Sequence, residues 1–60
     1  MEKNMSIREY ANQIGFEVVG KLKFIQIGPD GARLYYDDAQ NEYYKSKTGI
    51  CIITADGGVI

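Results

Sequence analysis

Apolar residues near the N-terminus recur with the spacing of a short amphipathic helix. Four of them fall at i, i+3, i+4 and i+7 and would share one helix face: Ile7, Tyr10, Ala11 and Ile14. Ser6 followed by Glu9 three positions later is typical of a capping box, and Gly15 suits the left-handed residue that ends a helix. We therefore predict a helix over residues 6–14, which must pack on another element because it is too short to be stable alone.

The rest of the chain has the alternation of apolar and polar residues that indicates β-strands. The first predicted strand covers residues 16–27, with a bend at Gly20 and a bulge near Lys23 and Phe24 where the alternation slips. Turn residues separate it from three further predicted strands and a short edge stub: residues 32–37, 42–47, 50–55 and 59–60. Short connections imply antiparallel pairing, so the sequence predicts one α+β domain over residues 1–60, with the helix packed on a four-stranded antiparallel β-meander.

The register between the second and third strands depends on the loop that joins them. A three-residue loop ending with Asn41 in a left-handed conformation pairs Tyr36 with Tyr44. A two-residue loop at Ala39 and Gln40 would instead pair Tyr36 with Tyr43, and the sequence leaves both registers open. The first of them gives a face that we expect beneath the helix: Ile25, Ile27, Ala32, Leu34, Tyr36 and Tyr44.

The opposite face combines three aromatic side chains with three cations: Phe24, Gln26, Arg33, Tyr35, Tyr43, Lys45 and Lys47. The last strand is apolar on both of its faces, from Ile50 to Ile53, whereas a sheet covered on one side should alternate. One short helix can cover only one face. The second face is therefore predicted to be an interaction surface, because contiguous exposed apolar patches usually mark one.

The composition limits the chemistry that the chain can perform. Sixty residues give marginal stability, and the single cysteine, Cys51, rules out an internal disulfide, which leaves self-association as the means of stabilisation. With no histidine and with Cys51 expected as a buried, inert thiol, we predict no catalytic, cofactor-binding or metal site, and no enzyme. The net charge of -1 argues against a protein that coats DNA.

These patterns predict a non-enzymatic protein–protein interaction module that forms a homodimer through a sheet face or an edge strand. Tyrosine and arginine are enriched at such interfaces, and the predicted contact residues are Phe24, Arg33, Tyr35, Tyr43 and Lys45. The alternative is single-stranded nucleic acid bound on the same aromatic and basic face. The longest apolar run is too short to cross a membrane and the N-terminus lacks the apolar core of a signal peptide, so we expect a cytoplasmic protein.

Overall fold

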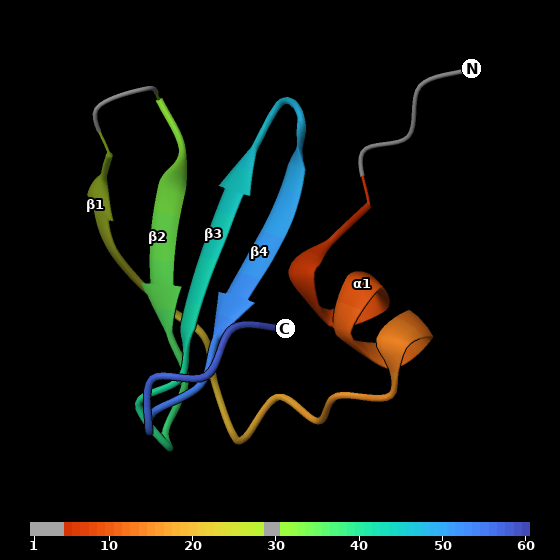
Figure 1. Ribbon diagram of the computed structural model, residues 1–60. Helices are drawn as coiled ribbons and strands as arrows, with labels where there is room; N and C mark the ends of the chain where they lie inside the picture. Colours follow the sequence, from red (N-terminus) through yellow and green to blue (C-terminus); the bar gives the residue numbers. More distant parts are fainter. Residues whose placement is uncertain (1–4, 29–30) are drawn as a thin grey trace.

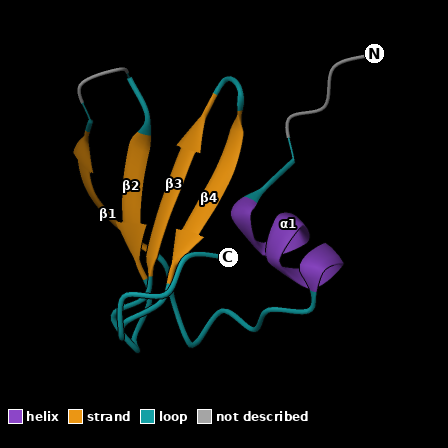
Figure 2. Ribbon diagram, viewed as in Figure 1, coloured by secondary structure: helices purple, strands orange, loops and turns teal. Residues whose placement is uncertain are grey.

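A computed structural model describes residues 5–28 and 31–60 of the chain. One helix, α1 (Ile7–Ile14), is followed by four strands: β1 (Lys23–Ile27), β2 (Arg33–Tyr36), β3 (Glu42–Ser46) and β4 (Gly49–Ile53). The strands form one antiparallel sheet in the order β1-β2-β3-β4, and Figure 1 shows α1 beside β4, with β1 at the far side of the sheet. This arrangement, coloured by element in Figure 2, confirms the predicted α+β meander.

The helix has the ends that the sequence predicts. The Ser6 hydroxyl accepts a hydrogen bond from the Glu9 N–H at 3.1 Å, and the Glu9 carboxylate accepts one from the Ser6 N–H at 2.9 Å. Gly15 ends the helix with a φ of 80°, a conformation that costs glycine little. Each signal involves residues that are close together in the sequence, which is why local sequence is sufficient to place this element.

The segment 16–22 is not part of the sheet, so the prediction of a strand beginning at Phe16 is wrong. It runs below the strands in Figure 1 and joins the sheet only at Lys23. Val19 fixes it to the β2–β3 loop: its N–H donates to Asp37 at 3.1 Å, and its carbonyl accepts the Asp38 N–H at 2.9 Å. These bonds replace the ladder bonds of a strand and hold the segment across the end of the sheet.

The loop between β2 and β3 closes one residue earlier than predicted. Gln40, and not Asn41, has the positive φ (70°), and the Asp37 N–H bonds to the Asn41 carbonyl at 3.2 Å. As a result Tyr35 lies opposite Tyr43, and both registers considered from the sequence are wrong. The three-residue loop is still the correct type, so the grouping of β2 and β3 side chains into two faces is right.

The helix packs on the opposite face of the sheet from the one we predicted. Its buried residues, Ile7 and Ala11, form the core with Tyr43 and Ile52, which have no exposed surface. Partly buried apolar side chains surround this cluster: Tyr10, Phe16, Val18, Leu22, Tyr35 and Ile50. Three of these side chains belong to the segment 16–22. The path of this segment below the sheet therefore leads the chain from the helix to the sheet on the face that carries Tyr43.

A register shift in β1 lies between Phe24 and Gln26, one residue beyond the predicted bulge. Lys23 lies opposite Tyr36, whereas Ile27 lies opposite Arg33 and so is not on the face of Ala32, where we expected it. Since side chains of directly opposed residues share a face, Ile27 belongs to the helix side of the sheet, together with Phe24.

Candidate interaction surface

The five predicted contact residues do share one face of the sheet, but it is the face on which α1 packs. Phe24, Tyr35 and Tyr43 lie opposite one another across three strands, and Arg33 lies opposite Lys45. Tyr43 is 0% exposed and contacts the helix, so the expectation that it lies on an open surface is wrong. Lys45 is half-buried on the same strand.

The helix covers this face only over β3 and β4, and side chains over β1 and β2 remain accessible. Phe24 is 54% exposed, Arg33 is exposed and Tyr35 is half-buried. The rings of Phe24 and Tyr35 pack edge to face, with centroids 5.7 Å apart. Three of the predicted contact residues therefore form the uncovered part of the face.

The adjoining strand β1 is exposed along its whole length. Two large apolar side chains, Ile25 (49% exposed) and Ile27 (61%), join Phe24 there. We define the β1 patch as these accessible neighbours: Phe24, Ile25, Ile27, Arg33 and Tyr35. We predicted both isoleucines beneath the helix, but α1 lies over the other end of the sheet.

β1 also has an open backbone edge, because no strand among the described residues pairs with its outer side. The Gly28 N–H donates to the Ala32 carbonyl at 2.7 Å. Inward and outward backbone groups alternate along an antiparallel strand, so the N–H and carbonyl of Ile27 point away from β2. An apolar strand with free donors and acceptors is the feature from which sheets extend between chains.

The other edge of the sheet is partly occupied by the C-terminal segment. Val59 forms a bridge with Ile53, and the Ile60 N–H donates to the Ile52 carbonyl at 2.9 Å. This confirms the edge stub predicted for residues 59–60. Among the described residues, the β1 edge is therefore the more open of the two.

The face away from the helix has a different character. The hydroxyls of Tyr36 and Tyr44 both donate to the Glu42 carboxylate, at 3.2 and 3.3 Å. This hydrogen bond raises the pKa of Tyr36, and burial followed by the Glu42 charge raises the pKa of Tyr44. Glu42 therefore supplies negative charge between the two rings of this face.

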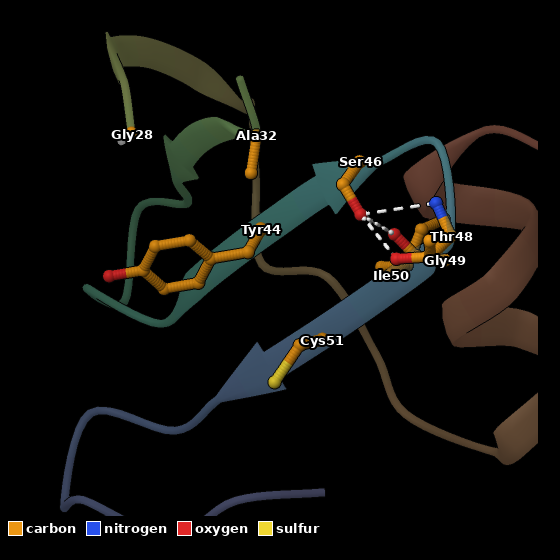
Figure 3. A pocket seen from close by; sticks show the side chains of 8 residues that line it. All are labelled: Gly28, Ala32, Tyr44, Ser46, Thr48, Gly49, Ile50 and Cys51. Atoms are coloured by element: carbon orange, nitrogen blue, oxygen red, sulfur yellow. Dashed lines mark hydrogen bonds between the residues drawn. The ribbon is translucent and has the colours of Figure 1, made fainter. Parts of the chain in front are cut away.

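A shallow, open hollow of about 620 Å³ lies on this second face, and Figure 3 shows its lining. Tyr44 and Cys51 lie opposite each other on neighbouring strands, and Ser46 and Gly49 close one end. Cys51 is exposed here, so the prediction of a buried thiol is wrong. Strand β4 has apolar residues on both of its faces, but only the face that carries Ile50 and Ile52 packs on the core.

The buried Asp37 carboxylate joins three segments of the chain, a role that we did not predict from the sequence. It accepts hydrogen bonds from the N–H groups of Val19, Ala39 and Asn41, from the Asn41 side chain, and from the Tyr43 hydroxyl at 2.6 Å. Burial alone would raise the pKa of Asp37, but these hydrogen bonds outweigh it and lower the pKa to about 2. An Asp–Asn pair at the ends of a tight loop was the only sequence signal of this network.

Neither a metal site nor a membrane-crossing element is found in the part of the chain that the structure describes. Within residues 5–28 and 31–60, no three histidine, cysteine, aspartate or glutamate side chains gather to hold an ion. The one described helix is too short to cross a bilayer. No protein-family model matches the chain, and neither a curated protein nor a solved structure matches it.

Proposed function

We propose that this chain is a small, non-enzymatic protein–protein interaction module that self-associates through the open edge of β1 and the adjoining β1 patch. The observation that carries the proposal is the exposure of Phe24, Ile25 and Ile27 on one edge strand. Apolar side chains and unpaired backbone groups there can be buried together by a single partner, which stabilises the bound state by both means.

The size of the patch sets the expected strength of the interaction. Three side chains that are each about half exposed can bury a few hundred Å² per copy, less than the roughly 800 Å² per partner of a standard interface. We therefore expect a dissociation constant on the order of 10 to 100 μM. The net charge of -1 opposes association of two copies only weakly.

The nucleic-acid alternative has less support from the side chains that remain accessible. Tyr43 is removed from the surface by the helix, and the planes of Phe24 and Tyr35 meet at 67°, so the two rings cannot both lie flat beneath successive bases. On the opposite face, the half-buried Tyr36 and Tyr44 both donate to the Glu42 carboxylate, which would repel phosphate. No observation favours this alternative, and we do not propose it.

The free thiol of Cys51 bears on the compartment in which the protein acts. Cys51 is exposed, and an exposed cysteine remains reduced most readily in a reducing compartment, so we propose the cytoplasm as the site of action.

Multi-angle light scattering on Ile27→Lys tests self-association. The wild-type mass should rise from 6.7 kDa towards twice that value, 13.4 kDa, between about 5 and 500 μM, which spans the expected dissociation constant. Ile27→Lys should weaken association at least tenfold, because pairing would desolvate the new ammonium group.

Ile14→Lys is the matched control, since Ile14 is 40% exposed on α1 and lies away from β1. It should associate like the wild type, and circular dichroism should show the same fold for all three proteins. A wild type that stays at 6.7 kDa throughout, or an Ile27→Lys variant that associates normally, would overturn the proposal.

A further inference from the structure

We infer that one end of the helix-side face of the sheet binds a phosphate group, held by Arg33 and Lys45 and attracted by the nearby Lys47. The site shares Arg33 with the β1 patch but needs only one copy of the chain, so it does not depend on self-association. It is carried by the direct opposition of two cations, by their lack of an acidic partner, and by the placement of the carboxylates at the other end of the sheet.

Two positive side chains are set directly against each other in the sheet. Arg33 of β2 lies opposite Lys45 of β3, so both side chains leave the same face next to each other. Like charges in such a pair repel and destabilise the sheet. Their neighbours in the same row are Ile27 on β1 and Ile50 on β4, which supply no opposite charge. An anion between the two cations replaces this repulsion with attraction.

The chain itself does not neutralise this pair. No carboxylate within residues 5–28 and 31–60 lies at ion-pairing distance from Arg33 or Lys45. The Arg33 side chain is exposed and that of Lys45 is half-buried, so both can reach a ligand. Several described carboxylates instead accept hydrogen bonds from uncharged groups close to them: Glu9, Asp37, Glu42 and Asp56.

The net charge of -1 conceals an uneven distribution of charge over the sheet. Figure 1 shows the start of β2, the end of β3 and the β3–β4 turn at the upper end of the sheet, and this end carries Arg33, Lys45 and the exposed Lys47. The described carboxylates of the strands and their loops belong to the lower end: Asp37, Asp38, Glu42 and Asp56. Cations gathered in this way raise the local concentration of an anion.

The arrangement fits a phosphate dianion better than a single carboxylate. The planar fork of an arginine can bond to two phosphate oxygens at once, and the ammonium group of a lysine beside it meets the remaining charge. Three cations at one end of the sheet neutralise one phosphate group and form no track for a nucleic-acid backbone. We expect a dissociation constant on the order of 1 to 10 mM for inorganic phosphate.

Thermal unfolding followed by circular dichroism tests the site, at about 5 μM protein, where the chain is monomeric. Phosphate, acetate and chloride are compared at equal ionic strength and at about pH 8, where phosphate is dianionic. Phosphate at about 50 mM should raise the Tm of the wild type by at least about 4 °C over chloride, because only the folded chain forms the site. Acetate should raise it by less than half as much.

Variants separate binding from the general stabilising effect of phosphate, which acts by exclusion from protein surfaces. The double variant Arg33→Gln with Lys45→Gln should lose at least half of the rise in Tm. Lys23→Gln is the matched control and should keep the rise, because Lys23 is exposed and lies opposite Tyr36, away from the site. At low salt without phosphate, Lys45→Gln should be at least as stable as the wild type, since it removes the repulsion.

Phenyl phosphate distinguishes two sources of the group. Tighter binding than inorganic phosphate supports an organic phosphate whose apolar part packs beside Tyr35, two residues along β2 from Arg33, and equal binding supports free phosphate. The inference is overturned if the double variant keeps the full rise in Tm, if acetate acts as strongly as phosphate, or if Lys23→Gln loses as much as the double variant. Self-association plays no part in these outcomes.

Discussion

Replacing Asp37 with alanine is expected to leave the chain largely unfolded at 25 °C. The substitution removes the acceptor for five hydrogen bonds and strands buried donors, among them the Tyr43 hydroxyl and the Val19 N–H. Breaking such a buried network costs about 3 to 5 kcal/mol. At about 0.05 to 0.15 kcal/mol per residue, a 60-residue chain has only about 3 to 9 kcal/mol of stability in total.

Urea denaturation followed by circular dichroism measures this effect. Asp38→Ala is the matched control: it removes an exposed carboxyl one residue away but keeps the backbone N–H that bonds to Val19, so its free energy of unfolding should change by less than about 0.5 kcal/mol. If Asp37→Ala retained the wild-type free energy of unfolding, the carboxylate would not hold the segments together.

The same carboxylate gives the stability a predictable dependence on pH. The pKa of Asp37 is lowered from 3.8 to about 2 in the folded state, so the unfolded chain takes up the proton first as pH falls. The contribution amounts to about 2 kcal/mol; it is complete above about pH 5 and is lost progressively as the pH falls through 3.8 and then through about 2. Asp37→Asn, if folded, should lack this part of the acid transition. A variant with an unchanged acid transition would show that other groups cause it.

Ile52→Ala is expected to have the second largest effect, a loss of about 2 to 5 kcal/mol in the free energy of unfolding. The Ile52 side chain is 0% exposed and lies beside Tyr43 on the neighbouring strand, in the cluster with the buried residues of α1, so its removal leaves a cavity in a small core. Ile27→Ala is the control of the same residue type. At concentrations where the chain is monomeric it should cost less than about 1 kcal/mol, because Ile27 is 61% exposed. Equal losses for the two variants would contradict the core described above.

The fold class was predictable from the sequence because its signals are local. The capping box of Ser6 and the glycine at position 15 define the helix, and the turn residues define the number of strands. The strand register was not predictable, because it depends on whether Gln40 or Asn41 takes the positive φ, and an asparagine normally does so more easily. Asn41 is instead held by Asp37, a contact that only the folded loop creates.

The candidate surface was only partly predictable, for a related reason. The sequence showed more apolar strand positions than one helix can cover, and the exposed Phe24, Ile25 and Ile27 support that count. It did not show which positions stay uncovered, because β4 is apolar on both faces and either could receive the helix. The path of residues 16–22 decides this, and it depends on the non-local bonds of Val19.

Hydrogen exchange at the Ile27 amide tests most directly whether β1 is the interaction edge. In the free chain this N–H points away from β2, so exchange should be fast at concentrations below the dissociation constant. Above it, the amide should exchange at least tenfold more slowly, while the amide of Lys47, in the exposed β3–β4 turn, should be unaffected. An Ile27 amide that exchanges at the same rate at both concentrations, in a sample that light scattering shows to be dimeric, would contradict the account.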